Sequence, residues 1–430
     1  MEDTCDVVVV GAGFAGIMAA RDLSADGHNV IVLEGRERIG GRTYTDDGIG
    51  RSVELGGAYV HWTQSHLWRE MRRHDIKFSA PLDVDKIYWI ADGRTNSGTA
   101  ADYDAACAPG IGAFIADSRE HFPLPFDDSA SDLSVIDKES IADRMANLNL
   151  SGYDRDVLDG MLTYTVADPA QQGVTQILKW SAIHFGDWRA MWEAGAYWRI
   201  ESGTKSLIDA MAEESGADIR LSNPVASVED TGSEVIVVTR NGDTVRAKAV
   251  VIAVPVNTLA DIDITPKVSE PVQRFIDEGH PMTNLKMWVR VRGEIEPFNA
   301  YAPAGANPIT IAMAEYYHEG DTLVVCFCPD ATSIDPDDKS AVQEALRAYV
   351  PDLEVVDTAC EDWASNEFSQ GTWMMMRPGQ FTECAPQIRK AHGRVHFAGS
   401  DIAPFYVGWI EGALESGALV ARTVSKTHLA

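Results

Sequence analysis

The sequence has few cysteines, and their arrangement excludes a disulfide-rich or metal-bound fold. Among 430 residues there are six, which are scattered at Cys5, Cys107, Cys326, Cys328, Cys360 and Cys384. No CxxC pair or His–Cys cluster has the spacing of a metal site, and Cys326 and Cys328 alternate as residues of one strand do. We therefore expect reduced cysteines in the protein core and no bound metal.

Basic residues and long apolar runs are also scarce. There are 36 lysines and arginines against 65 acidic residues, which gives a net charge of -29. Such a field repels nucleic acid and anionic membranes and favours cationic ligands, although solubility alone also explains it. No apolar run is long enough to span a bilayer, and the acidic start leads directly into a strand rather than a signal peptide. We expect a cytoplasmic protein without nucleic-acid or membrane partners.

What the sequence does contain is an alternation of strands and helices over a length typical of two or three domains. "DVVVVGAGFAGIMAARDL" and "NVIVLEG" predict an opening βαβ unit. A mostly helical region follows from about residue 132 to 209. "DIRLSNPVASVED", "EVIVVTR" and "AVVIAVP" predict strands that return to the first domain. We expect an α/β protein with two interleaved domains, the first from residues 1–79, 203–284 and 385–430 and the second from 80–202 and 285–384.

The turn after the first strand carries a dinucleotide-binding pattern. Gly11, Gly13 and Gly16 form GxGxxG between strand and helix. These glycines permit a tight turn, close approach of a pyrophosphate and close helix–strand packing, and the helix N-terminus offers free N–H groups. Glu34 ends the second strand, where a carboxylate accepts hydrogen bonds from ribose hydroxyls and disfavours a 2′-phosphate. A glycine turn without a ligand is the alternative.

A second glycine-rich loop follows Glu34 at once. Arg36, Gly40, Gly41 and Arg42 in "RERIGGRTY" would bring a second loop onto the same pyrophosphate, which a plain NAD domain does not need. The extended pattern resembles the flavin-containing amine oxidase family, and the resemblance covers nearly the whole chain. It implies bound FAD and a fold like that of monoamine oxidase and p-hydroxybenzoate hydroxylase. In detail the sequence looks most like the bacterial 6-hydroxy-L-nicotine oxidases.

The resemblance also implies further cofactor contacts. "ELGGAYVH" resembles the segment that contacts flavin, and "NPVASV" resembles the strand that binds adenine through the backbone of its valine. "HFAGSDIAPFYVGWIEGALESG" resembles the C-terminal flavin motif, although the family usually has glutamate where Ser400 stands. The implied contacts from these three segments are Gly57, Ala58, Tyr59, Val225, Gly399, Ser400, Asp401, Gly408, Trp409 and Ile410.

One lysine stands out in the stretch "TNLKMWV". Leu285 and Met287 alternate with Lys286 and Trp288, so we expect a strand in which Lys286 points away from its apolar neighbours. A lone lysine on a strand is usually a charge on a wet face. The resemblance implies instead that Lys286 holds a water next to flavin N5.

Two tryptophans match the family's aromatic cage. In "FSQGTWMMMRPGQF" Thr372 stands where some relatives attach flavin through cysteine, so we expect FAD to be non-covalent. Trp373 follows, where the family has one wall of the cage, and Trp409 stands at the other wall, commonly a tyrosine. Aromatic faces suit an amine with positive character, whereas the alternative is that both tryptophans are ordinary core residues.

The implied reaction is hydride transfer from the carbon next to nitrogen to flavin N5. The imine then hydrolyses to an aldehyde or ketone, and oxygen reoxidises the flavin to give hydrogen peroxide, the last step being implied by the family alone. A cytochrome or quinone acceptor remains open, as does the oligomeric state, a homodimer included. We expect a bulky aromatic or alicyclic monoamine in a pocket lined by Tyr59, Thr163, Thr165, Tyr316, Trp373 and Trp409.

Other functions share this fold. A 6-hydroxynicotine oxidase is one alternative. An L-amino-acid oxidase needs an arginine for the substrate carboxylate, for which Arg199 and Arg377 are candidates. A desaturase or porphyrinogen oxidase does not need the paired aromatics. A non-catalytic module like the prenyl-GTPase dissociation inhibitors has no use for Lys286 or for an intact RxGGR pattern.

Overall fold

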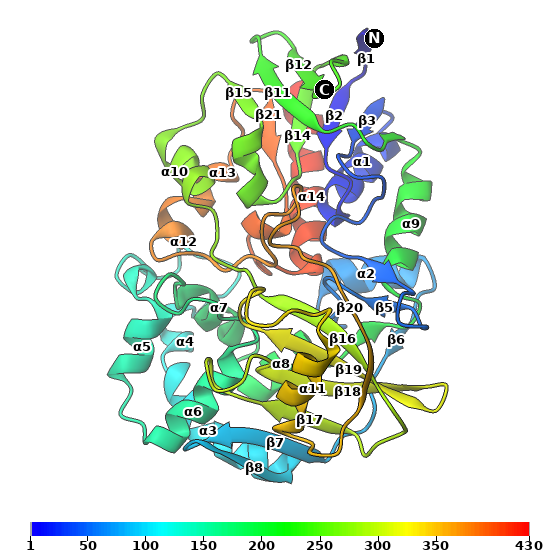
Figure 1. The fold of residues 1–430 in the computed structure, drawn as a ribbon. Helices are drawn as coiled ribbons and strands as arrows, with labels where there is room; N and C mark the ends of the chain where they lie inside the picture. The colour runs from blue at the N-terminus through cyan, green and yellow to red at the C-terminus, as the bar shows by residue number, and fades with distance from the viewer. Residues whose placement is uncertain (1, 430) are drawn as a thin grey trace.

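The computed structural model describes residues 2–429, which form two units stacked one above the other (Figure 1). The upper unit in that view contains two five-stranded sheets, and the lower unit is built on a seven-stranded sheet. Both ends of the chain lie in the upper unit. None of the helices in the described part is long and apolar enough to cross a membrane.

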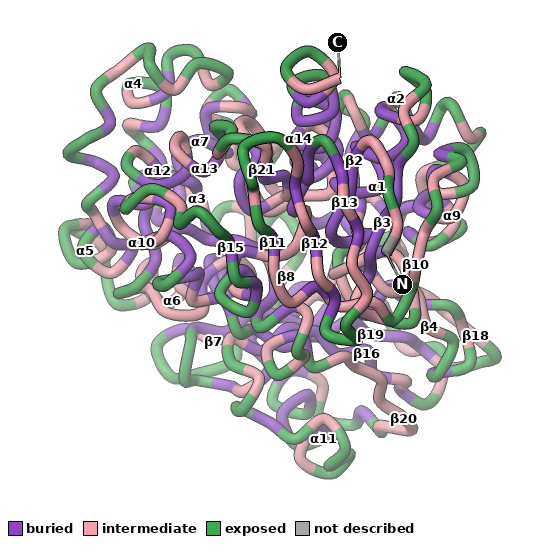
Figure 2. Tube along the Cα trace, turned by 90° about the horizontal axis from the view of Figure 1, so that it is seen from above, coloured by how far each residue is buried: buried purple, intermediate pink, exposed green. Residues whose placement is uncertain are grey.

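A parallel sheet of short strands forms the centre of the upper unit. Its order is β10 (Asp218–Arg220), β3 (Val30–Leu33), β2 (Val7–Val10), β14 (Ala249–Ile252) and β21 (Val395–Phe397). The central strands are buried on both faces, as runs of valine and isoleucine in parallel sheets usually are (Figure 2). One face packs on α1 (Phe14–Ala25), α9 (Thr204–Ser215) and α14 (Ile410–Val424). The opening βαβ unit is therefore confirmed.

The second sheet covers the other face of the parallel sheet. Its order is β1 (Glu2–Thr4), β13 (Thr244–Ala247), β12 (Val235–Thr239), β11 (Val225–Asp230) and β15 (Asp263–Thr265). The segment "DIRLSNPVASVED", predicted to be extended, contains two strands, of which β10 joins the parallel sheet and β11 joins this one. A turn with positive φ at Ser222, followed by Pro224, separates the two strands.

The seven-stranded sheet presents one face to the site and the other to α11 (Lys339–Arg347). Its order is β20 (Val355–Cys360), β16 (Leu285–Val291), β19 (Asp321–Cys328), β18 (Ile311–His318), β17 (Phe298–Tyr301), β7 (Lys86–Ala91) and β8 (Arg94–Thr99). Leu285, Met287 and Val289 pack with α11, whereas Trp288 packs in the core on the opposite face. The predicted alternation in β16 is confirmed, and it puts Lys286 on the side of Trp288.

Helices close the site face of this sheet. They are α3 (Ala100–Phe114), α4 (Ser118–His121), α5 (Ile141–Asn147), α6 (Gly152–Leu162), α7 (Thr175–Ile183) and α8 (Trp188–Ala196). The remaining helices are α2 (Ser65–Arg73), α10 (Glu270–Glu278), α12 (Gln380–Glu383) and α13 (Ala385–Ile388). Two-stranded pairs are formed by β4 (Thr45–Asp46) with β5 (Val53–Glu54) and by β6 (Phe78–Ser79) with β9 (Arg199–Ile200).

Replacement of Gly16 by alanine tests how tightly α1 packs on the glycine turn. A Cβ there would lie 1.9 Å from the carbonyl oxygen of Gly11 and 3.2 Å from Cγ1 of Val9. We expect Gly16→Ala to lower the free energy of unfolding by roughly 1–3 kcal/mol in urea titrations. Gly112→Ala in α3, where a Cβ meets nothing within 4 Å, is the control and should raise it by up to about 1 kcal/mol. Equal effects of both changes would contradict the packing argument.

Candidate active site

One cavity extends from the carboxyl ends of the parallel strands to the face of the seven-stranded sheet that carries Lys286. Most residues that the sequence predicts for cofactor binding line it, namely Gly11, Gly13, Glu34, Arg36, Gly41, Arg42, Gly57, Ala58, Tyr59, Val225, Gly399, Ser400, Gly408, Trp409 and Ile410. Gly16 and Asp401 do not line it. They act on it through the neighbours that they hold in place.

Two glycine loops form a tight cradle beside the first turn of α1. Gly11 has a φ of +101°, and a Cβ there would lie 2.8 Å from the carbonyl oxygen of Ala253. A Cβ on Gly41 would lie 3.3 Å from Cα of Gly13, so the loops approach each other backbone to backbone. Helix α1 begins at Phe14 with no side chain capping it. Its free N–H groups and the positive end of its dipole therefore suit a diphosphate.

A carboxylate and a buried guanidinium flank the cradle. Glu34 accepts hydrogen bonds from the backbone N–H groups of Ala12 (2.7 Å) and Arg36 (2.9 Å), and its oxygens keep lone pairs for a ribose hydroxyl. Arg36 donates to Asn366 (2.7 Å), but its buried Nε has no partner among the described residues. Burial lowers the pKa of Arg36 to about 10, against the charge of Glu34. An anionic phosphate would pair with this group, so the site fits a dinucleotide.

Arg42 joins four segments that surround the middle of the cavity. Its guanidinium donates to the carbonyl oxygen of Thr372 (2.7 Å), to Oγ of Ser400 (3.0 Å) and to Oδ1 of Asp401 (2.5 Å). Its own carbonyl accepts from the N–H of Gly57 (3.0 Å). Burial opposes ionisation of Asp401, yet the charge and hydrogen bonds of Arg42 outweigh it and hold the pKa of that carboxyl below its usual value.

Lys286 is buried next to the segments that Arg42 joins. It is 5% exposed, and its Nζ donates to the carbonyl oxygen of Gly56 (2.8 Å) and lies 5.7 Å from the centre of the Tyr59 ring. Burial lowers the pKa of Lys286 to about 8, although the carboxylates of Glu315 and Glu54 act in the opposite direction. An ordinary charge on a wet face is excluded. The amine lines the cavity with one hydrogen bond to protein and two donors free for other partners.

Aromatic rings enclose the cavity near Lys286. Trp373 stacks with Tyr164, with ring centres 5.8 Å apart and planes at 27°. Trp409 meets Trp180 edge to face at 5.7 Å. All four line the cavity, and a Cβ on Gly195 of α8 would lie 3.1 Å from the Trp409 ring. The two predicted cage residues are thus brought to one cavity and buttressed by other aromatics.

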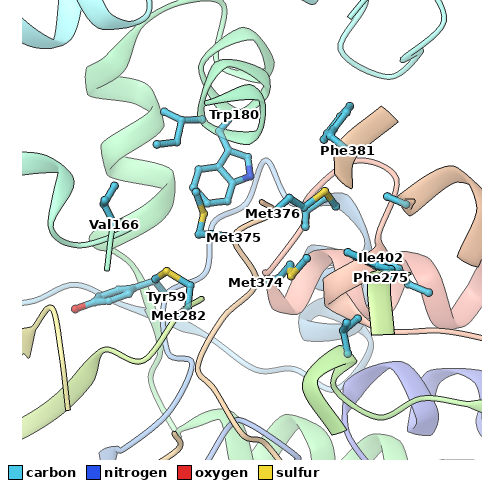
Figure 3. Packing of buried hydrophobic residues seen from close by; sticks show 14 of the residues in the cluster. Tyr59, Val166, Trp180, Phe275, Met282, Met374, Met375, Met376, Phe381 and Ile402 are labelled. Carbon is cyan, nitrogen blue, oxygen red and sulfur yellow. The ribbon is translucent and has the colours of Figure 1, made fainter. Parts of the chain in front are cut away.

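Helix α7 holds the segment that carries Trp373 in place. Gln176 of α7 donates to the carbonyl oxygen of Met374 (2.8 Å) and accepts from the N–H of Met376 (3.1 Å). The three methionines that follow Trp373 lie in the same apolar core as Tyr59 and Trp180 (Figure 3). These hydrogen bonds fix the residues that follow Trp373 and so help to position the tryptophan.

Two residues that the sequence predicts for the substrate pocket lie elsewhere. Thr163 is buried and donates to the carbonyl oxygen of Gly160 (2.8 Å), because it caps the end of α6. Tyr316 stacks on Trp288 with ring centres 5.8 Å apart and lies under Arg51. A bulge between Ala314 and Tyr316 changes the register of β18, which a period of two in the sequence does not reveal. Both predictions are corrected. Thr165 and Tyr59 do line the cavity.

Sequence reasoning missed several aromatic wall residues. Tyr164 lies between the two predicted threonines and contacts Trp373, Tyr59 and Phe327. Its hydroxyl donates to the carbonyl oxygen of Gly195 (3.1 Å), which ties it to α8. The signal available in the sequence was the tyrosine in "LTYTVAD". Its direction could not be predicted, because side chains in a turn follow no regular period.

Neither arginine considered for a substrate carboxylate is free. Arg199 pairs with buried Glu315 and donates to the carbonyl oxygen of Tyr197 (3.1 Å). Arg377 donates to the carbonyl oxygens of Glu278 (3.1 Å) and Gly279 (3.3 Å). Neither lines the cavity that contains Lys286. The geometry therefore does not favour an amino-acid oxidase.

The lowered pKa of Lys286 predicts a stability difference that depends on pH. Between pH 8 and 10.5 the unfolded chain binds a proton that the folded chain has released, so stability of the wild type rises across this window. Methionine has no such proton. Relative to Lys286→Met, the wild type should therefore gain up to about 3 kcal/mol on going from pH 7 to alkaline pH. Urea unfolding at several pH values measures this, with Lys390→Met as the exposed control. A difference that does not change with pH would contradict the burial argument.

Known proteins share both the sequence and the fold. A model of the family described as flavin containing amine oxidoreductase matches residues 14–425. Pseudooxynicotine dehydrogenase from Pseudomonas sp is 34% identical over 432 residues, 98% of this chain and 86% of that protein. (S)-6-hydroxynicotine oxidase from Paenarthrobacter nicotinovorans is 32% identical over 438 residues, 96% and 97% of the two chains. The structure of putrescine oxidase bound to putrescine covers 99% of this chain and 100% of its own at a TM-score of 0.85 and 22% identity. The chain therefore belongs to the flavin-containing amine oxidoreductase family.

Proposed function

We propose that the protein binds FAD without a covalent link and oxidises a bulky aromatic or alicyclic monoamine. The observation that carries this proposal is the set of residues that line one cavity. One part of it is lined by the glycine cradle and Arg36, and another part by Lys286, Trp373 and Trp409. A dinucleotide that fills the first part would present its reactive ring to the second.

The chain supplies a partner for each part of the proposed cofactor. The cradle and Arg36 hold the diphosphate, Glu34 accepts from the adenosine ribose, and the backbone of Val225 contacts adenine. Arg42 positions Ser400 near the ribityl chain. Helix α14 begins at Ile410 without a side-chain cap, so its free N–H groups suit the electron-rich edge of the ring. Bound FAD supplies the hydride acceptor that no side chain can replace.

The aromatic part of the cavity selects the neutral form of the amine. An ammonium has no lone pair, and an apolar pocket disfavours its charge. The carbon next to nitrogen loses a hydride as the lone pair of nitrogen forms the C=N bond. Water then hydrolyses the imine to a carbonyl compound and an amine or ammonia. Lys286 holds a water by its free donors at the place where we expect the reacting centre.

The side chains in this part set the substrate class. They are Tyr59, Tyr164, Thr165, Trp180, Lys286, Phe327, Trp373 and Trp409, with no carboxylate or arginine among them. A diamine would lack a partner for its second ammonium, and an amino acid would lack an arginine for its carboxylate. A large apolar group beside a single amine fits best. Nicotine-related amines are the second candidate, because relatives named for such compounds are 32–34% identical to this chain.

Non-covalent attachment and the electron acceptor belong to the same proposal. Threonine at position 372 cannot form a thioether, and none of the six cysteines lines the cavity. Oxygen is the acceptor we propose, reduced to hydrogen peroxide by the two electrons taken from the amine. A cytochrome or quinone is the alternative, because two relatives are named dehydrogenases. In this scheme residues 1–79, 203–284 and 385–430 bind FAD, and 80–202 and 285–384 bind substrate.

Anaerobic reduction by a panel of amines tests the function. Purified protein is mixed with bulky monoamines, diamines, nicotine-related amines and L-amino acids, and the flavin absorbance is followed. We expect bleaching by bulky monoamines and none by diamines or amino acids. A yellow protein that amino acids bleach and amines do not would contradict the proposal. Admission of air, with an assay for hydrogen peroxide, then decides between oxygen and another acceptor.

Replacement of Trp373 tests the aromatic slot. We expect Trp373→Ala to slow anaerobic flavin reduction by roughly tenfold or more, because the amine loses a wall that orients its reacting carbon. Trp68→Ala is the control, since Trp68 is 39% exposed and lies on α2, outside the cavity. Stopped-flow absorbance gives both the limiting rate and the amine concentration for half-maximal rate. Equal rates for both variants would contradict a positioning role.

A further inference from the structure

A second cavity, of about 630 Å³, lies beside the first and is lined by charged and aromatic residues. We call it the vestibule. Its walls come from residues 81–84, from the α8 side chains of Trp188, Trp192 and Glu193, from residues 197–199, and from β17 and β18. Its size is typical of a small-molecule site. The reaction proposed above does not require the vestibule.

The carboxylates of the vestibule outnumber its cations. Arg189 is held by Asp104 through two hydrogen bonds of 2.8 and 2.6 Å, and Arg199 is held by Glu315. Within each of these two pairs the positive and negative charges cancel. Asp83 and Glu193 also line the vestibule and are exposed.

Neither of these two carboxylates has a lysine or arginine within salt-bridge distance in the part of the chain that is described. Glu193 lies 3.7 Å from Nε2 of His61, and burial lowers the pKa of that histidine, so it is neutral near pH 7. Glu193 also accepts a hydrogen bond from the indole N–H of Trp198 (3.2 Å). The vestibule therefore carries about two uncompensated negative charges, from Asp83 and Glu193.

One buried acceptor in the vestibule lacks a partner. Glu315 is 1% exposed, and its Oε1 accepts from the hydroxyl of Tyr59 (3.2 Å) and pairs with Arg199. Its Oε2 has no hydrogen-bond partner among the described residues. A buried carboxylate oxygen without a donor is costly, so a ligand that donates hydrogen bonds would be favoured here.

A third, small apolar space has wall residues in common with both the vestibule and the amine cavity. That space shares Trp192 and Ala196 with the vestibule, and Tyr164, Trp180 and Trp409 with the amine cavity. The Trp192 ring lies 5.8 Å from the ring of Tyr164, which in turn stacks on Trp373. Aromatic rings thus line all three spaces.

We propose that the vestibule is a binding site for organic ammonium ions, where the protonated amine docks before it passes as a neutral base into the apolar cavity. Alkylamines are protonated near pH 7, as lysine is, so a purely apolar entrance would reject most of the amine in solution. Free carboxylates at Asp83 and Glu193 attract the cation, and the rings of Trp192 and Trp198 stabilise it. The proposal rests on the proposed amine substrate, but the site itself is testable alone.

Choline is the probe for this site, because its trimethylammonium group keeps its charge at every pH and cannot be oxidised as an amine. Its uncharged isostere, in which a tert-butyl group replaces trimethylammonium, is the matched ligand. Calorimetric titration of the flavin-loaded protein should detect binding of choline and not of the isostere. The Asp83→Asn/Glu193→Gln double variant should bind choline roughly tenfold more weakly, and its binding should depend less on salt.

The Glu344→Gln/Asp352→Asn variant is the control for net charge. Both residues are exposed, and they lie on or just beyond α11, which packs on the far face of the seven-stranded sheet. It should bind choline as the wild type does. Equal choline binding by all three proteins, or equal binding of the isostere and choline, would overturn the proposal. Failure of the proposed function appears separately, as a flavin that no amine reduces, whatever choline does.

Discussion

The geometry of the whole site depends on the guanidinium of Arg42. It fastens the second glycine loop to the segment before Trp373, by way of the carbonyl of Thr372, and to the C-terminal segment at Asp401. Its backbone carbonyl holds Gly57. The preceding carbonyl, that of Gly56, accepts the hydrogen bond of Lys286. The side chain and backbone of Arg42 therefore couple the part of the cavity that suits a diphosphate to the part that carries the amine and the aromatic rings. A buried ion pair such as that of Arg42 with Asp401 adds little net stability, but loss of one partner leaves an uncompensated charge.

The three spaces differ in polarity. The vestibule has uncompensated carboxylates, the small space is apolar, and the amine cavity holds a single buried amine among aromatic rings. The same change in environment that lowers the pKa of Lys286 would also favour the neutral form of an incoming amine. In our proposal the carboxylates of the vestibule attract the cationic amine, and the apolar cavity then favours its neutral form.

Local sequence patterns predicted the parts of the fold that depend on near neighbours. The glycine spacing located the cradle, and a period of two located Lys286 on the site face of β16. The predictions that failed depend on irregular geometry. Thr163 caps a helix, so Tyr164 enters the cavity instead, and a bulge in β18 turns Tyr316 onto Trp288. The vestibule could not be predicted, because its walls come from segments more than 200 residues apart in the chain.

The most direct test of the account is the identity and stoichiometry of the cofactor in the purified protein. The account predicts a yellow protein from which acid releases about one FAD per chain into solution, with no flavin left on the precipitated polypeptide. Arg42→Ala should hold much less FAD, because it loses the ion pair that joins the cavity segments. A colourless protein that takes up no FAD would contradict the central claim. Flavin that stays on the polypeptide after acid would contradict the non-covalent attachment.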